Sequence, residues 1–147
     1  MTKDPPVAVA AALAERRGRV FLARRAGHKG SPGLWELPGG KLEAGEAAEA
    51  ALARELREEL GVSARVEPVP YDGYEREIEH RRYRFLVYRV SWEGDPESST
   101  DHDRWEYFDP RGIPFDALAP LDEPVLRRWV RDAGGAVRGR EVMEREE

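Results

Sequence analysis

"LWELPGGKLEAGEAAEAALARELREELGV", residues 34–62, decides the fold, because a glycine-rich loop runs directly into a charged helix with a leucine stripe. The pattern predicts a helix over 47–60 that ends at Gly61, the residue type favoured for a left-handed C-cap. The helix carries an apolar stripe with one residue every four positions: Leu52, Leu56 and Leu60. Such a stripe is expected to pack against a sheet.

Three glutamates beside the stripe are badly placed for helix stability. Glu55, Glu58 and Glu59 follow i, i+3, i+4 spacing, so their carboxylates cluster on one face. Each like-charge pair costs a few tenths of a kcal/mol, and the C-terminal end of the helix dipole disfavours each acid by roughly 0.3–1 kcal/mol. A bound divalent cation would reverse this repulsion, because hard cations take oxygen ligands. The alternative is a solvated acidic face, which most charge runs form.

The loop before the helix supports the cation interpretation. Pro38, Gly39 and Gly40 are expected to turn the backbone and to bring a bare peptide carbonyl close to whatever the acids hold. Glu46 stands at the helix start, where the dipole favours an acid, and it can equally be an ordinary helix-start residue.

Length and composition fit one globular domain, predicted over residues 1–133, followed by a polar tail over 134–147. The chain has 147 residues and a formal net charge of −5, so nothing draws it toward long nucleic acids. It contains no cysteine, which excludes disulfides and thiolate nucleophiles. No apolar run reaches transmembrane length and the first residues lack a secretory signal, so no membrane partner is expected and a cytoplasmic protein is the default.

Other elements are expected on both sides of this segment. Residues 7–25 predict a β-hairpin, and residues 83–90, apolar on both faces, predict an interior strand. Residues 93–103 are rich in turn formers and predict a loop. A final helix is expected after Asp122, a natural N-cap. Its apolar face holds four residues: Val125, Leu126, Trp129 and Val130.

Taken together, Gly40-x5-Glu46-x7-Arg54-Glu55-Leu56-x-Glu58-Glu59-x-Gly61-Val62 resembles the Nudix box at every defined position. "VFLARRA" before it, the lead-in "WELPGGKLEAGE", and "LAPLDEPVLRRW" near the end look like the MutT-type branch of that family. The resemblance covers most of residues 7–130, strongly in the box and loosely elsewhere.

The resemblance implies an α/β/α sandwich with a mixed sheet, in which the box forms a loop–helix–loop. It also implies Mg²⁺- or Mn²⁺-dependent hydrolysis of a small nucleotide. MutT-like members cleave a nucleoside triphosphate, including oxidised or non-standard ones, to the monophosphate and pyrophosphate. One alternative is an ADP-ribose or other nucleoside-diphosphate-X hydrolase. The alternative of another class is a module that binds a nucleotide without cleaving it, and the complete set of box acids argues against it.

The resemblance assigns roles within the box by matched position. The Gly40 carbonyl, Glu58 and Glu59 would bind the first metal ion. Glu55 would be the general base or a further ligand, and Arg54 would orient the glutamates through hydrogen bonds.

Outside the box the resemblance suggests four further candidates. Asp101 or Asp103 would supply one more metal-binding acid, although both can be plain loop residues. Arg25 would contact the phosphates, or be a surface arginine at a strand end. Asp122 would face the base edge, or only cap its helix. The lead-in loop adds two expected substrate contacts: Gly39 and Lys41.

The remaining aromatic and imidazole side chains carry weaker expectations. Trp35 and Trp105 flank a base or, as is more usual beside a sheet, belong to the core. The histidines show no ligand spacing and are expected at the surface: His28, His80 and His102. Whether the protein is a monomer or a homodimer stays open.

Overall fold

A mixed seven-stranded sheet forms the centre of the molecule in the computed structural model, which describes residues 4–28 and 30–146. The strands are β1 (Val7–Arg16), β2 (Arg19–Arg25), β3 (Trp35–Glu36), β4 (Gly39–Lys41), β5 (Arg65–Ile78), β6 (Arg81–Ser91) and β7 (His102–Phe108). Their order is β3-β2-β1-β6-β5, with β4 also paired to β1 and β7 to β2. The helices are α1 (Ala48–Leu60) and α2 (Glu123–Glu146), with short 3₁₀ turns η1 (Pro110–Gly112) and η2 (Phe115–Ala117) between β7 and α2.

The predicted hairpin is confirmed and is the branch point of the sheet. β1 and β2 pair only near their turn, where Arg16 faces Arg19. Arg17 and Gly18 have φ of 55° and 76°, so they form a two-residue turn whose twist matches the strands. Beyond it the strands part: β1 runs parallel to β6, whereas β2 pairs with β3 and β7.

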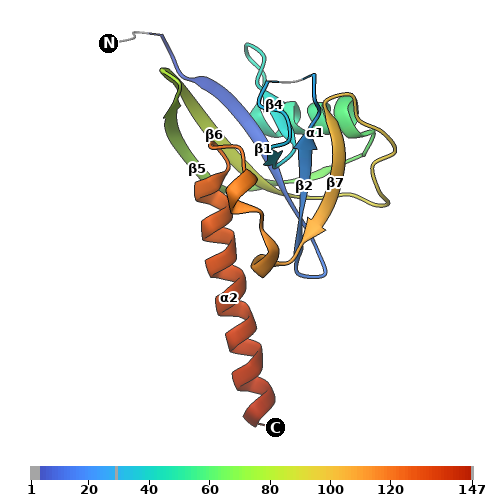
Figure 1. The fold of residues 1–147 in the computed structure, drawn as a ribbon, viewed down its shortest axis with the longest axis vertical. Helices are drawn as coiled ribbons and strands as arrows, with labels where there is room; N and C mark the ends of the chain where they lie inside the picture. Colours follow the sequence, from blue (N-terminus) through green and yellow to red (C-terminus); the bar gives the residue numbers. More distant parts are fainter. Residues whose placement is uncertain (1–3, 29, 147) are drawn as a thin grey trace.

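Two helices cover opposite faces of the sheet, which confirms the α/β/α sandwich (Figure 1). Side chains alternate along β1: Ala10 and Ala12 pack in the cluster that contains the α1 leucines. Ala11 and Leu13 point the other way, into the cluster that contains Trp129 of α2. The small alanines on the first face leave room for α1 to lie close to the sheet.

Helix α1 follows the sequence prediction closely. It begins at Ala48, one residue later than predicted, and Ala47 precedes it in an extended conformation. Gly61 ends it with φ 70° and ψ 18°, and the Gly61 N–H donates to the Arg57 carbonyl. The leucine stripe is completely buried, as predicted: Leu52, Leu56 and Leu60.

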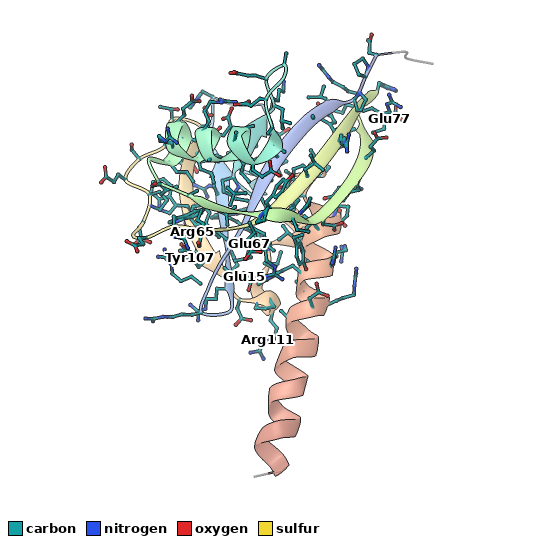
Figure 2. The ribbon with its side chains drawn as sticks, turned by 180° about the vertical axis from the view of Figure 1, so that it is seen from behind. Glu15, Arg65, Glu67, Glu77, Tyr107 and Arg111 are labelled. Carbon is teal, nitrogen blue, oxygen red and sulfur yellow. The ribbon has the colours of Figure 1, made fainter. Side chains whose placement is uncertain are left out.

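The predicted interior strand is β6, which lies between β1 and β5. Its partner β5 is the long edge strand, and Figure 2 shows it running from Arg65 and Glu67 at one end to Glu77 at the other. The loop predicted over 93–103 ends slightly earlier, because His102 and Asp103 already belong to β7.

Helix α2 begins where the sequence predicts and buries the expected face on Val125, Leu126 and Trp129. It continues to Glu146, so the segment expected to be a polar tail is helical in its backbone (Figure 1). The domain boundary at residue 133 stays a prediction. Within residues 4–28 and 30–146, no helix is both long and apolar enough to span a bilayer.

Candidate active site

A pocket of about 480 Å³ lies where β1, β4, the β5–β6 hairpin, the start of β7 and the start of α2 meet. It is lined by most of the residues expected to bind substrate or metal: Arg25, Gly39, Gly40, Lys41, Glu59, Asp101 and Asp122. The structure thus brings together residues that are up to about a hundred positions apart in the chain. Arg54, Glu55 and Glu58 lie on α1 beside this pocket rather than in its wall.

Gly40 is where the backbone of the lead-in loop meets the acids of α1. A Cβ placed on Gly40 would lie 2.4 Å from Cδ of Glu55 and 2.7 Å from its Oε2. Any side chain here would therefore displace the Glu55 carboxylate. The close approach of bare backbone and acid, expected from the sequence, is present.

The expected turn at Gly39 and Gly40 is wrong, because both residues belong to strand β4. Hydrogen-bonded pairs alternate along an antiparallel ladder with pairs whose peptide groups point apart. Two backbone hydrogen bonds show which pairs are bonded: the Ala12 N–H donates to the Pro38 carbonyl at 2.9 Å, and the Leu42 N–H donates to the Ala8 carbonyl at 3.0 Å. Gly40 therefore directs its peptide groups toward Ala10, whereas Gly39, opposite Ala11, turns its carbonyl away from β1. The register favours Gly39 over Gly40 as the source of an available carbonyl.

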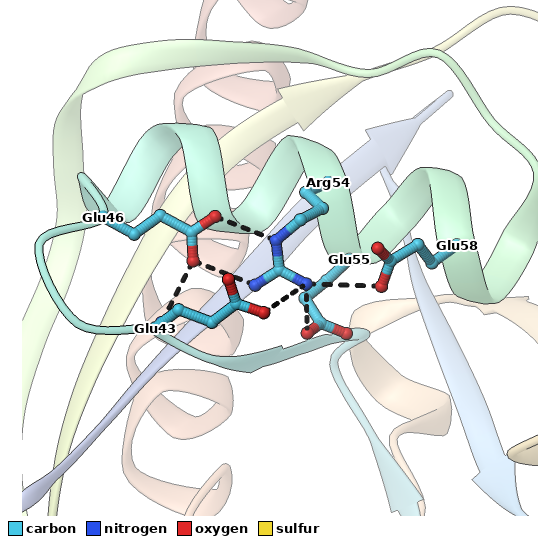
Figure 3. Close-up of polar contacts among 5 residues, drawn as sticks. All are labelled: Glu43, Glu46, Arg54, Glu55 and Glu58. Atoms are coloured by element: carbon cyan, nitrogen blue, oxygen red, sulfur yellow. Dashed lines mark hydrogen bonds and ion pairs between the residues drawn. The ribbon is translucent and has the colours of Figure 1, made fainter.

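Arg54 is the centre of an ion-pair network along α1 (Figure 3). It donates to both carboxylate oxygens of Glu46, from Nε at 2.8 Å and from NH2 at 2.9 Å. Its NH1 donates to Glu55 at 3.0 Å and to Glu58 at 3.3 Å. The hydrogen bonds from Arg54 are the main reason that the pKa of Glu46 falls to about 2. Arg54 thus makes the contacts expected of a residue that orients the box glutamates.

Glu59 is a partly buried acid that lies among other acids and shares a hydrogen bond with Asp101. Burial, followed by the charges of Glu55 and Asp101, raises the pKa of Glu59 to about 9. Its Oε2 is buried and has no hydrogen-bond partner. An orphaned carboxylate oxygen surrounded by other acids is costly, and a hard cation would satisfy it.

Asp101 and Asp103 have different surroundings, which separates the two candidates for the additional acid. Asp101 lines the pocket and contributes to the raised pKa of Glu59. Asp103 accepts a hydrogen bond from Arg24 at 2.8 Å, and this contact lowers the pKa of Asp103. The geometry therefore favours Asp101.

The oxygen ligands available here fit a hard divalent cation, but the carboxylates are not arranged around a common centre. Among residues 4–28 and 30–146, no group of three or more acidic or histidine side chains forms a complete ligand set. Glu58 is turned toward Arg54, and its side chain is 60% exposed. Its rotation toward Glu59 would complete the oxygen cluster.

The pocket also contains two polar residues that no motif or spacing in the sequence marks as functional. Glu36 lines the wall, with Oε1 3.7 Å from NH1 of Arg25 and Oε2 2.9 Å from Nε2 of His102. The expectation that His102 is a surface residue is wrong, because it is 5% exposed. The one local indication of a functional residue is that Glu36 is charged although both of its neighbours, Trp35 and Leu37, are buried.

Asp122 combines its two expected positions. It precedes the first residue of α2, and its carbonyl accepts the backbone hydrogen bond from Leu126. Its carboxylate lies in the pocket, where Oδ2 accepts from the Leu37 N–H at 2.8 Å. Burial, and then the charge of Glu36, raises the pKa of Asp122 well above its usual range. A carboxyl group kept protonated can donate as well as accept a hydrogen bond.

Most of the remaining pocket wall is apolar and comes mainly from the β5–β6 hairpin and the segment before α2: Ile78, Tyr83, Phe85, Ala119 and Leu121. Trp35 and Trp105 are not among the lining residues and pack in the two hydrophobic clusters instead. The core interpretation of both tryptophans is therefore the right one. The pocket has an acidic end, a basic group in Arg25, and an apolar region.

Comparison with known proteins agrees with this arrangement. The family model described as NUDIX domain matches residues 4–132. A CTP pyrophosphohydrolase of Escherichia coli K12 is 34% identical over 124 residues, covering 84% of this chain and 91% of that protein. An 8-oxo-dGTP diphosphatase of the same strain is 32% identical over 123 residues, covering 81% of this chain and 92% of that protein. The solution structure of the E. coli ORF135 protein superposes with a TM-score of 0.71 at 34% identity and covers 90% of each chain.

Fold, box and pocket define a Nudix-type hydrolase of phosphoric anhydrides. The chain belongs to the Nudix family, and within it to the MutT-like branch. Members of this family generally depend on a divalent metal ion.

Proposed function

We propose that this protein hydrolyses a nucleoside triphosphate to the monophosphate and pyrophosphate, with Mg²⁺ or Mn²⁺ as cofactor. The observation that carries the proposal is the buried, unpartnered Oε2 of Glu59 at one end of a pocket that also holds Arg25. A cluster of acids beside the positively charged Arg25 suits a polyphosphate with its metal ion, and does not suit a neutral ligand. CTP and 8-oxo-dGTP, named for the E. coli relatives, are the first substrates to test.

The residues divide into three groups along the pocket. Glu58, Glu59 and Asp101, with a glycine carbonyl, would hold the metal ion, and the β4 register favours Gly39 for that carbonyl over the Gly40 that the box resemblance implies. When bound, such an ion neutralises phosphate charge and acidifies water. Arg25 and Lys41 bind the phosphates, and Asp122 faces the base.

Proton transfer is assigned to Glu55, which takes the proton of the attacking water. The hydrogen bond from Arg54 holds its carboxylate, and the absence of a side chain on Gly40 gives that carboxylate its space. Water adds to phosphorus as the bridge between the α- and β-phosphates breaks, which releases the monophosphate and pyrophosphate.

One panel of substrates tests the proposal. Nucleoside triphosphates, oxidised nucleotides, ADP-ribose and dinucleoside polyphosphates are incubated with the protein and Mg²⁺, and the phosphate products are identified. Pyrophosphate and a monophosphate from a triphosphate are expected. Preferential cleavage of ADP-ribose would favour the nucleoside-diphosphate-X alternative, and a uniform lack of cleavage would favour a nucleotide-binding module.

Magnesium is expected to raise the melting temperature of the free protein. A ligand that binds only the folded state, at a concentration about ten times its Kd, raises the free energy of unfolding by about 1.4 kcal/mol. For a domain of this size this raises the melting temperature by about 3–6 °C. Differential scanning fluorimetry with Mg²⁺, and with NaCl at matched ionic strength, measures the shift. Glu59→Gln is expected to abolish most of it, and a wild-type melting temperature indifferent to millimolar Mg²⁺ would contradict a metal site here.

Asp122→Ala is expected to change the choice of base more than the overall rate on a good substrate. The change removes a pocket carboxyl group that pairs with the Leu37 N–H, and unmatched polar groups alter discrimination between ligands by about ten-fold or more. Ratios of kcat/KM across CTP, GTP, ATP and UTP measure the effect. Asp122→Asn keeps an acceptor for Leu37 and separates that structural contact from base recognition. Equal losses with every base would leave Asp122 with a capping role only.

A further inference from the structure

His102 makes a complete set of polar contacts on the pocket wall. Its Nε2 lies 2.9 Å from Oε2 of Glu36, and its Nδ1 lies 3.3 Å from Oγ of Ser99. The backbone N–H of His102 also donates to the same Ser99 oxygen at 3.1 Å. A buried network in which each polar atom has a partner holds its members in one arrangement.

The partners determine where the imidazole carries its proton. An ionised carboxylate can only accept, so Nε2 of His102 carries the hydrogen that Glu36 receives. In the neutral ring Nδ1 is then the acceptor, and the Ser99 hydroxyl donates to it. The ring thus lies between Ser99 and Glu36, and its 2.9 Å hydrogen bond to Glu36 is the contact that holds the carboxylate.

Glu36 forms a long ion pair with Arg25 but no hydrogen bond to it. Their nearest atoms, Oε1 and NH1, are 3.7 Å apart, beyond hydrogen-bond range. The Arg25 Nε is buried and has no hydrogen-bond partner. A carboxylate released from His102 would close the remaining gap and pair with the guanidinium, because a charge-assisted contact is favoured in a partly buried site.

We propose that His102 is a positioning residue that holds Glu36 back from Arg25 and so keeps the Arg25 guanidinium available for a substrate phosphate. The proposal rests on the proposed function, in which Arg25 binds the phosphate chain. It concerns binding rather than chemistry, because the polar partners of the His102 side chain among the described residues are Glu36 and Ser99.

The test measures binding of α,β-methylene CTP, whose α–β bridge cannot be hydrolysed, by calorimetry with Mg²⁺, together with kcat and KM for CTP. His102→Ala is expected to weaken binding and raise KM about ten-fold, while kcat changes less than about three-fold. His102→Gln keeps a donor for Glu36 and is expected to retain most of the affinity. Ser99→Ala leaves the contact between His102 and Glu36 in place and serves as the matched control, with wild-type affinity expected within about two-fold.

The decisive variant is His102→Ala combined with Glu36→Gln. If the released Glu36 charge is what blocks Arg25, removing that charge restores affinity to within about two-fold of wild type. A double variant as weak as His102→Ala would overturn the proposal, since it would show that His102 only supports the loop. Wild-type affinity in His102→Ala would overturn it as well. Wild-type protein that binds the analogue but cleaves no nucleoside triphosphate of the panel would contradict the proposed function alone.

Discussion

Glu59→Gln is expected to reduce turnover by at least about a hundred-fold, because the change removes a metal-binding carboxylate whose contribution amounts to several kcal/mol. The fold should remain intact, since glutamine has the same shape and Glu59 makes no hydrogen bond through its buried Oε2. Steady-state kinetics on the best substrate of the panel, at saturating Mg²⁺, measures the loss. Glu58→Gln is expected to lose activity in the same way.

The same substitution should stabilise the metal-free protein as the pH rises. The pKa of Glu59 is about 9 in the folded protein and about 4.5 when unfolded, so between these values the folded state binds the extra proton. The stability that protonated Glu59 provides is complete below pH 4.5 and is lost as the pH rises toward 9, by at most about 1.4 kcal/mol per pH unit. Glutamine does not titrate, so the advantage of Glu59→Gln over wild type should grow across this range.

Urea unfolding in the presence of EDTA at pH 5, 6.5 and 8 measures that advantage. Glu67→Gln removes an exposed acid near the start of β5, whereas the pocket is lined by Ile78 at the other end of this strand, and it is the control for lost charge, with the same small effect expected at each pH. Glu58→Gln should resemble this control in stability, because its side chain is 60% exposed, and resemble Glu59→Gln in activity. A Glu59→Gln protein that keeps full turnover would refute the metal assignment.

Local patterns are sufficient to predict the elements that carry the box. The leucine stripe and Gly61 predict α1 almost to the residue, because helix periodicity and a left-handed cap are properties of neighbouring residues. The misplaced acids likewise indicate function from their spacing alone, and Glu59 indeed lies among acids with its Oε2 buried. Violations of local rules are most informative where no local partner resolves them.

Partners distant in sequence explain what local patterns miss. The burial of His102 depends on Glu36, 66 residues earlier, and the Asp122 carboxylate depends on Leu37, 85 residues earlier. Neither partner can be inferred from spacing, because the sheet and the segment before α2 bring them together. The two glycines expected in a turn form a strand for the same reason: their register is set by pairing with β1.

Gly39→Ala is expected to destabilise the fold by about 3 kcal/mol, and to lower the melting temperature by about 6–12 °C. A Cβ on Gly39 would lie 2.0 Å from the Ala10 carbonyl oxygen and 2.8 Å from Cα of Ala11. Both atoms belong to the backbone of β1, which cannot move aside as a side chain can, so β4 must separate from β1. Thermal unfolding without added metal measures the effect.

Gly40→Ala is the contrasting variant, because its Cβ would meet the Glu55 carboxylate rather than backbone. A flexible side chain can move, so Gly40→Ala should lose activity with a smaller loss of stability than Gly39→Ala. Gly27→Ala is the matched control, since a Cβ there has no heavy atom within 4 Å among the described residues. A Gly39→Ala protein with the same melting temperature as the Gly27→Ala control would show that β4 does not approach β1 this closely. The position of the Gly39 carbonyl, and with it the choice of Gly39 over Gly40 as a ligand, would then have to be abandoned.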